Sequence, residues 1–291
     1  MDTNGREPTT TPAPADGTPS LPAAARLTLN RCNLPAVVLG SLTYQQHPVP
    51  LEIDGIRAFH RDLFRVLKGV TDHAERARRF QDYVSAHFCL DHLEDAGLDT
   101  SRRRPGRGQR AKANYLRLVR GWSFSSDGRE GAVLKHWVER RFGLLARHHA
   151  GPLHGRGSEP YQQYVMEAVG GLYGTNALEA QLDLLYTYCQ HELALAHPGA
   201  QHLTLYRGTN RIDEHEVLGK RPGGRWLVLL NNLNSFTTNR ERAGEFGDYI
   251  LETLAPLPKV FFYNRLLPGM LKGEDEVVVI GGVYEVRLRT L

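Results

Sequence analysis

The stretch "EDEVVVIGGVYEVRL", residues 274–288, decides the fold class of the C-terminal part of the chain. Its apolar, β-branched run is typical of a buried strand. Four more such runs come before it, separated by turn residues, at 202–208, 226–238, 248–254 and 259–266. We therefore expect a sheet-rich unit after Gly199, interrupted by one short helix at 239–246.

The chain before Gly199 has a different periodicity. Apolar residues recur three and four positions apart, as on one face of a helix, in the segments 55–70, 75–93, 133–150 and 176–197. Together the two patterns predict an α+β fold. We expect a single domain over residues 26–291, in which a mainly helical part, 26–200, packs on a sheet-rich core, 201–291.

The composition is that of a globular protein without a membrane span. Of the 291 residues, 41% are hydrophobic and 23% are charged, and the chain has no apolar run of about 18 residues. The three cysteines are widely spaced and include no Cys-x-x-Cys pair, which favours the reducing cytoplasm over a disulfide framework. The first 25 residues contain five prolines and five threonines, and we interpret them as a disordered tail and not a signal peptide.

A basic segment, "SRRRPGRGQRAKANYLRLVR" at 101–120, carries eight lysines and arginines in a chain of net charge +4. Such a patch attracts phosphate backbones, so a nucleic-acid-binding protein is one hypothesis. The segment lacks an aromatic platform and a helix-turn-helix pattern. We therefore interpret it as a solvated loop and helix face, or as a docking patch for an acidic protein, and expect no nucleic-acid partner.

Three patterns that could indicate known sites fail on spacing. "GRGSEP" (155–160) has a proline where a dinucleotide fingerprint needs its third glycine, and no strand precedes it. His191 and His197 are six residues apart, whereas two helical zinc ligands need a spacing of four. His87 and Cys89 lie on different sides of a predicted helix. We therefore predict no metal site.

Two signals in the C-terminal part suggest contacts to a ligand. The first predicted strand ends in Arg207 and Gly208; a guanidinium fork matches phosphate oxygens, and a glycine lets a ligand approach the backbone. On a later strand Ser235 and Thr237 are two residues apart, so an extended chain directs both hydroxyls to one face. These hydroxyls could hold a ribose or orient a carboxylate.

The third signal is the acidic triplet at 274–276. On an extended chain Glu274 and Glu276 point to the same face, roughly 7 Å apart, while Asp275 points the other way towards solvent. Two such carboxylates could divide the work, one stabilising positive charge at a sugar carbon and the other positioning a nucleophile. An acidic turn that keeps the strand end soluble is the alternative interpretation.

Arg, Ser-x-Thr and Glu-x-Glu, in this order and each at a strand, resemble the Arg-Ser-Glu class of mono-ADP-ribosyltransferases. The Ser-Thr-Ser motif of the class corresponds to Ser235-Phe236-Thr237, with two of its three residues changed. The resemblance implies a cleft between two small antiparallel or mixed sheets that binds NAD+ as a substrate. The residues it implies for binding NAD+ are Arg207, Gly208, Ser235, Thr237 and Glu276.

The same resemblance implies a division of catalytic roles. Glu276 would bind the nicotinamide ribose and stabilise the oxocarbenium ion as nicotinamide leaves, and Ser235 would orient this carboxylate. Glu274 would position an acceptor arginine and take its proton. No metal ion is needed for this chemistry.

A closer resemblance covers the chain from about residue 30. The segments 30–42, 50–64 and 75–84 resemble the dinitrogenase reductase ADP-ribosyltransferases of nitrogen-fixing bacteria. This implies an acceptor arginine on dinitrogenase reductase, the nitrogenase iron protein, whose modification reversibly switches off nitrogen fixation. It also implies regulation by a PII signalling protein. An arginine-specific transferase with another protein target, or an NAD glycohydrolase, is the alternative.

Overall fold

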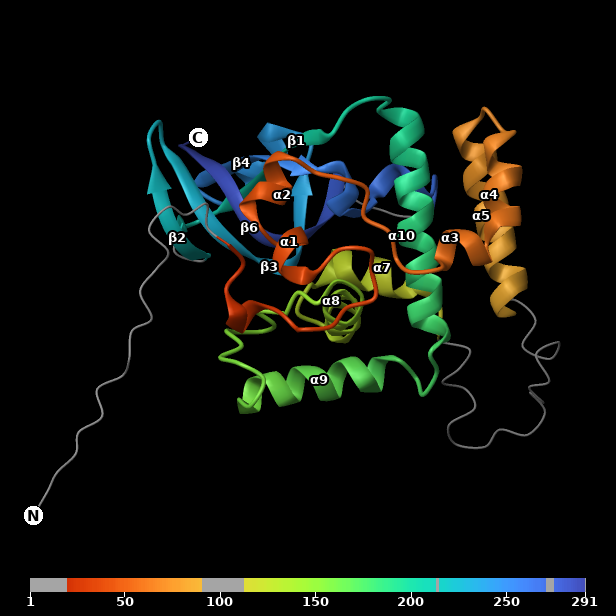
Figure 1. The fold of residues 1–291 in the computed structure, drawn as a ribbon, viewed down its shortest axis with the longest axis horizontal. Coiled ribbons are helices and arrows are strands. Elements are labelled where there is room, and N and C mark those ends of the chain that lie inside the picture. Colours follow the sequence, from red (N-terminus) through yellow and green to blue (C-terminus); the bar gives the residue numbers. More distant parts are fainter. Residues whose placement is uncertain (1–19, 91–112, 213–214, 271–274, 291) are drawn as a thin grey trace, which may run out of the picture.

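The computed structural model of the protein describes residues 20–90, 113–212, 215–270 and 275–290. Helices make up the first part of the chain. They are α1 (Ala36–Leu39), α2 (Leu42–Gln46), α3 (Ile56–Phe59), α4 (Arg61–Lys68), α5 (His73–Phe88), α7 (Tyr115–Phe124), α8 (Arg129–Phe142), α9 (Glu159–Gly171) and α10 (Ala177–Ala196). In Figure 1, α10 stands beside the strands of the second part of the chain. Helices α4 and α5 lie on the side of α10 away from these strands, and α8 and α9 lie below the strands.

The packed chain begins before residue 26, the predicted start of the domain. A short 3-10 helix spans Ala23–Ala25, and Leu21 and Ala25 are buried in the main hydrophobic core. The expected boundary of the tail is therefore too late by several residues, because proline and threonine content does not show which apolar side chains find a partner. Residues 1–19 of the predicted tail lie outside the described residues.

Most predicted helical segments correspond to observed helices. The segment 133–150 is the exception, because its helix α8 starts earlier, at Arg129, and ends at Phe142. Gly143 ends it in the left-handed conformation, with φ 71°, as a glycine C-cap commonly does. The helices α1, α2 and α9 were not predicted, and α7 was expected only as the helix face of the basic segment 101–120. Helix α9 begins after Ser158, whose hydroxyl accepts a hydrogen bond from the backbone N–H of Tyr161.

The second part of the chain is an antiparallel sheet. Its strands are β1 (His202–Thr209), β2 (Glu216–Arg221), β3 (Arg225–Thr237), β4 (Tyr249–Pro256), β5 (Val260–Tyr263) and β6 (Glu276–Thr290). All strand pairings among the described residues are antiparallel, and the order is β2-β3-β1-β4-β6-β5. Of these strands only β2 was not predicted, because its sequence "EVLGKR" is polar. The predicted short helix is present as α11 (Arg240–Ala243) and a following 3-10 turn.

The two small sheets expected from the resemblance are continuous here, because β3 also pairs with β6 along most of its length. The register shifts between Leu230 and Leu233, where the strands bend. At this bend a Cβ on Gly281 would lie 1.7 Å from the Asn231 carbonyl oxygen, so only glycine allows the backbones to approach this closely. Lys259, fully buried, donates a hydrogen bond of 2.8 Å to the Gly281 carbonyl oxygen.

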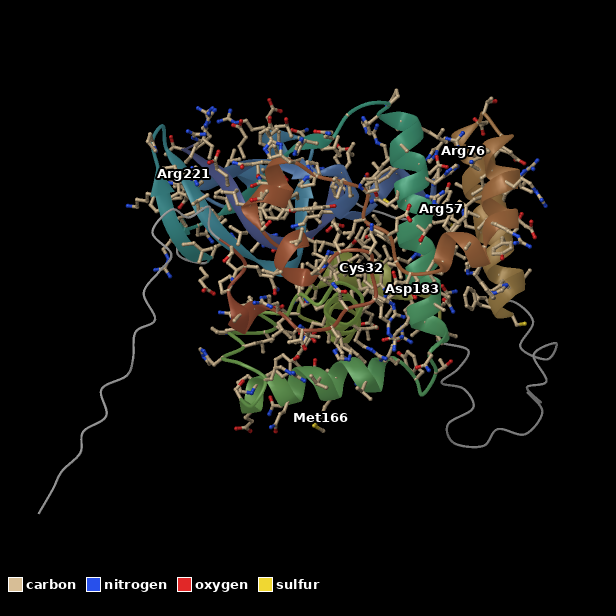
Figure 2. All side chains as sticks on the ribbon, in the orientation of Figure 1. Cys32, Arg57, Arg76, Met166, Asp183 and Arg221 are labelled. Carbon is tan, nitrogen blue, oxygen red and sulfur yellow. The ribbon has the colours of Figure 1, made fainter. Side chains whose placement is uncertain are left out.

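Buried ion pairs join α5 and α8 to α10, and Figure 2 labels one residue of each pair, Arg76 and Asp183. From α5, Arg76 Nε donates to Glu192 Oε1 at 2.7 Å. From α8, Arg141 Nε donates to Asp183 Oδ1 at 2.6 Å. Breaking such a pair on one side leaves an uncompensated buried charge, which commonly costs about 3–5 kcal/mol. The helical part is therefore held to α10 by specific contacts as well as by apolar packing.

One hydrophobic cluster joins the helical part to the sheet. It contains Phe80 of α5 and Tyr188 of α10, whose rings stack with centroids 4.1 Å apart, together with Val278 of β6. The sheet therefore has no separate core of its own. Among the helices that the structure describes, none is both long and apolar enough to cross a bilayer.

Candidate functional site

Strand pairing brings three of the predicted site residues together. β3 pairs with β1 at Tyr206 and Thr237, and with β6 at Thr237 and Glu276. Arg207 follows Tyr206 in β1, and Ser235 is two residues before Thr237 in β3. The ends of three strands that are far apart in sequence therefore meet at one place.

A network of short hydrogen bonds connects these three residues. Ser235 Oγ donates to Glu276 Oε1 at 2.7 Å. Arg207 Nη1 donates to the Ser235 carbonyl oxygen at 2.8 Å. Hydrogen bonds to ionised groups are among the stronger ones in proteins and fix the geometry of both partners. Arg207, Ser235 and Glu276 thus form one preorganised cluster at the strand ends.

Gly208 and Thr237 have partners within the chain itself. A Cβ on Gly208 would lie 2.2 Å from the Ala243 carbonyl oxygen and 2.9 Å from Phe246. The packing of α11 and the following turn against β1 therefore requires glycine here, whether or not a ligand approaches. Thr237 is buried, and its Oγ1 accepts a hydrogen bond of 3.1 Å from the backbone N–H of Asn239, which stabilises the turn after β3.

The acidic triplet is not a continuous strand. β6 begins at Glu276, and Asp275 before it has φ 55°, in the left-handed region that Asp adopts more readily than most residues. The expected alternation of side chains therefore stops at Asp275. Its carboxylate pairs at 3.0 Å with Arg265, whose side chain is 79% exposed, so the Asp275 side chain lies at the surface as expected, although the backbone does not continue the strand. Glu274 lies outside the described residues, and its role stays a prediction.

Helix α7 supplies two contacts that the sequence analysis missed. The indole N–H of Trp122 donates to Ser235 Oγ at 2.9 Å. Ser123 Oγ donates to Glu276 Oε2 at 2.9 Å. Each carboxylate oxygen of Glu276 thus accepts one hydroxyl hydrogen bond, and the Ser235 hydroxyl is itself held by Trp122. A carboxylate has about four lone-pair positions, so Glu276 can accept further hydrogen bonds from a ligand.

The sequence contains a signal for this helix. Tyr115, Leu118, Val119 and Trp122 recur at helical spacing, and all four are buried in the structure. Asn114 caps the helix by accepting a hydrogen bond from the Leu116 N–H. The basic segment 101–120 was interpreted as a solvated loop and helix face, and the buried apolar side of this helix was not recognised. Even so, helical periodicity does not reveal which strand the helix contacts.

A cavity of about 880 Å³ adjoins the cluster. Its wall includes Arg207 and Ser235 from the sheet, Trp122 from α7, Lys135 from α8 and Arg147 from the segment after α8. This volume is within the range of roughly 300–1,000 Å³ that is usual for small-molecule and cofactor sites. Three cationic side chains and two carboxylates, those of Asp127 and Glu216, line the cavity, which leaves its wall one net positive charge. Asp127 pairs with Lys135 and Glu216 pairs with Arg147.

Lys135 is the most deeply buried of these cations. Its Nζ donates to Asp127 Oδ1 at 2.9 Å and to the His148 carbonyl oxygen at 3.0 Å. Burial lowers the pKa of Lys135, and the Asp127 carboxylate opposes this effect. Burial alone would raise the pKa of the Asp127 carboxyl, but the Lys135 ammonium outweighs it and lowers that pKa. Each group thus favours the charged form of the other at the cavity wall.

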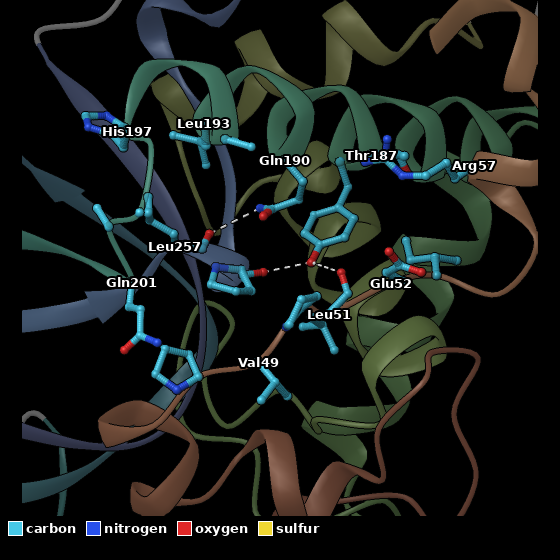
Figure 3. A pocket seen from close by; sticks show the side chains of 18 residues that line it. Val49, Leu51, Glu52, Arg57, Thr187, Gln190, Leu193, His197, Gln201 and Leu257 are labelled. Atoms are coloured by element: carbon cyan, nitrogen blue, oxygen red, sulfur yellow. Dashed lines mark hydrogen bonds between the residues drawn. The ribbon is translucent and has the colours of Figure 1, made fainter. Parts of the chain in front are cut away.

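A second cavity, of about 480 Å³, lies between α10 and the segment before α3 (Figure 3). The Tyr186 hydroxyl lies 2.9 Å from the Leu51 carbonyl oxygen and 2.7 Å from the Pro258 carbonyl oxygen at its floor. None of the predicted site residues lines this cavity. Elsewhere in the described part of the chain, no group of three or more His, Cys, Asp or Glu side chains is arranged to hold a metal ion.

An Arg, a Ser and a Glu that meet on neighbouring antiparallel strands of an α+β fold define the Arg-Ser-Glu class of mono-ADP-ribosyltransferases. Within this class, the family model of the dinitrogenase reductase ADP-ribosyltransferases (DRAT) matches residues 29–288, and the chain belongs to this family.

The chain is also similar to a curated relative, the NAD(+)--dinitrogen-reductase ADP-D-ribosyltransferase of Rhodospirillum rubrum. The two are 39% identical over 263 residues, which cover 89% of this chain and 93% of the relative. No solved structure shows a significant match to the chain.

Proposed function

We propose that this protein transfers ADP-ribose from NAD+ to one arginine of dinitrogenase reductase and so switches off nitrogen fixation reversibly. Family membership supports the reaction and the acceptor. The observation that carries the proposal is the contact of 2.7 Å between Glu276 and Ser235, because Ser235 and Arg207 both line the cavity of about 880 Å³.

NAD+ is proposed to bind in the cavity of about 880 Å³. Its pyrophosphate carries negative charge, and the guanidinium of Arg207 is suited to phosphate oxygens. Lys135 and Arg147 lie on the same wall, each in an ion pair, with Asp127 and Glu216 respectively. Gly208 and Thr237 are proposed to act through the backbone shape around Arg207 and Ser235, because their own contacts are to the chain.

Glu276 is proposed to promote cleavage of the glycosidic bond. The bond between the ribose C1' and the nicotinamide nitrogen breaks, and its electron pair leaves with nicotinamide. Positive charge then develops on the ribose, and a carboxylate already fixed in position stabilises it without reorganising. Ser235 and Ser123 hold the two carboxylate oxygens of Glu276 and so supply this fixed position.

Glu274 is proposed to prepare the acceptor. A guanidinium group is protonated in water, with a pKa above about 12, and is a nucleophile only after losing a proton. Glu274 takes that proton as an arginine nitrogen forms its new bond to C1'. The support is the family resemblance, in which this position precedes the catalytic glutamate by two residues.

We also propose a cytoplasmic location and a PII signalling protein as the regulator. The described chain contains three free cysteines, as expected in a reducing compartment. The regulator is supported by the family resemblance alone. It predicts that purified PII protein changes the rate of ADP-ribose transfer in a reconstituted assay.

The proposed function is tested by incubating the protein with labelled NAD+ and purified iron protein of nitrogenase. Label on a single arginine of the iron protein, found by peptide mass spectrometry, is the expected result. Release of nicotinamide without label on the iron protein would favour an NAD glycohydrolase. Label on other proteins of a cell extract, but not on the iron protein, would indicate a different acceptor.

Arg207→Lys is expected to raise the Kd for NAD+ by at least about ten-fold. Lysine keeps the positive charge but loses the guanidinium fork, and charge-assisted hydrogen bonds are worth about 1.5–3 kcal/mol. Isothermal titration with NAD+ measures the change, and Arg221→Lys on the edge strand β2 is the matched control. An unaltered Kd in the Arg207 variant would count against a phosphate contact.

Trp122→Phe is expected to lower kcat by about five-fold and to leave the KM for NAD+ within about two-fold. Phenylalanine retains most of the packing but removes the N–H that holds the Ser235 hydroxyl, a bond worth about 1 kcal/mol. Steady-state release of nicotinamide measures both constants. Trp226→Phe, in β3 but away from the cluster, serves as control. A wild-type kcat in the Trp122 variant would show that this bond does not help to position Glu276.

A further inference from the structure

The outer side of α7 borders the candidate site. The inner side of this helix carries Trp122 and other buried residues, whereas Arg117, Arg120, Ser123 and Phe124 are exposed. Phe124 is 93% exposed, the highest exposure among the large hydrophobic residues described. It directly follows Ser123, whose hydroxyl contacts Glu276. We call Arg117, Arg120 and Phe124 the α7 face.

A groove of about 680 Å³ runs along the α7 face, towards the start of α8. All three residues of the face line it, together with Gly121 and Glu130. Glu130 packs closely on the helix, since a Cβ on Gly121 would lie 2.5 Å from Glu130 Cγ. A shallow groove with one exposed aromatic ring at its edge is a common form of protein-binding surface.

The two arginines of the α7 face differ in whether a carboxylate pairs with them. Arg117 is paired with Glu130 at 3.2 Å. Arg120 donates through Nε to the Met270 carbonyl oxygen at 3.0 Å, and no carboxylate of the described residues forms an ion pair with it. Among the described residues, therefore, no carboxylate neutralises its positive charge. A partner with a carboxylate opposite Arg120 would supply the missing charge.

We propose that the α7 face is the docking surface for the protein acceptor, which meets it with an acidic surface and an apolar contact for the Phe124 ring. The proposal rests on the proposed function, in which the acceptor is a protein. A specific interface covers roughly 800 Å² on each partner. A protein that delivers an arginine to Glu276 therefore also covers the neighbouring exposed residues, and Phe124 is next to the Ser123 that contacts Glu276.

The test compares protein and small acceptors in variants of Phe124. Phe124→Ala is expected to raise the KM for the iron protein about ten-fold, as for an aromatic residue central to an interface. Transfer to a small guanidine such as agmatine, and NAD+ hydrolysis without acceptor, are expected to stay within about two-fold of wild type. Phe59→Ala is the matched control, because Phe59 is 74% exposed on α3, on the other side of α10 in Figure 1.

Charged substitutions of Phe124 test whether the surface of the partner is acidic. Phe124→Asp is expected to raise the KM for the iron protein more than Phe124→Lys does, because an acidic partner repels the new carboxylate. This difference should shrink as salt is added. The reverse order would contradict an acidic partner.

Two results would overturn the docking surface. The first is that the wild-type protein modifies the iron protein, but the Phe124 variants have an unchanged KM for it. The other is an equal loss of activity on agmatine and on the iron protein, which would show that the ring supports the site and not the partner. A wild-type protein that hydrolyses NAD+ but does not modify the iron protein would instead remove the proposed acceptor, and with it this docking assignment.

Discussion

Replacing Glu276 with Gln is expected to lower both ADP-ribose transfer and NAD+ hydrolysis by about 10³-fold. The amide is neutral and cannot stabilise the positive charge of the ribose, and losing one preorganised electrostatic partner typically costs 10²–10³ in kcat. The amide also presents N–H donors to hydroxyls that now donate to a carboxylate. Nicotinamide release, with and without acceptor, measures both reactions.

The control for this variant is Glu241→Gln, at an exposed position in α11. Thermal unfolding of both variants shows whether the fold is retained. Folded Glu276→Gln protein with a rate within ten-fold of wild type would disprove the catalytic assignment. Loss of transfer with hydrolysis retained would indicate that Glu276 acts on the acceptor arginine and not in cleavage of the glycosidic bond.

Replacing Glu274 with Ala is expected to lower transfer to the iron protein by about 10²-fold while NAD+ hydrolysis stays within a few-fold of wild type. General-base catalysis contributes about 10²–10⁴-fold in rate, and only the acceptor arginine needs its proton removed. The two activities are measured in parallel on the same preparation. The contrast with Glu276 thus separates bond cleavage from acceptor activation.

Two further variants sharpen the result for Glu274. Glu274→Asp keeps a carboxylate and should restore part of the transfer, whereas Glu274→Gln should not. Transfer by the alanine variant at the wild-type rate would remove Glu274 from the reaction. An equal loss of hydrolysis would instead show that Glu274 also supports the NAD+ site.

The elements of the fold were predictable where one pattern dominated a segment. The strands β1, β3, β4, β5 and β6 are apolar and β-branched, and α5 and α10 have strong helical periodicity, so each was predicted. The polar edge strand β2 gives no such signal. The continuity of the sheet was not predictable, because it depends on β3 and β6 pairing through a bend that Gly281 allows.

The candidate site was predictable only in part. Arg207, Ser235 and Glu276 were found because their order along the chain is that of a known class, and the strand register brings them together. The contacts of Trp122 and Ser123 connect segments more than a hundred residues apart, which local patterns do not reveal. Strand alternation failed at Asp275 because its backbone leaves the extended conformation.

The position of α7 determines how far the protein can be truncated. Residues 201–291 contain Arg207, Ser235 and Glu276, and by sequence they could be taken for a minimal catalytic fragment. Such a fragment would lack the Ser123 hydroxyl on Glu276 and the Trp122 N–H on Ser235. It would also expose the side of the sheet that shares its hydrophobic cluster with the helices. The smallest working unit of this enzyme must therefore extend back through α7, with the helices that hold α7 in place.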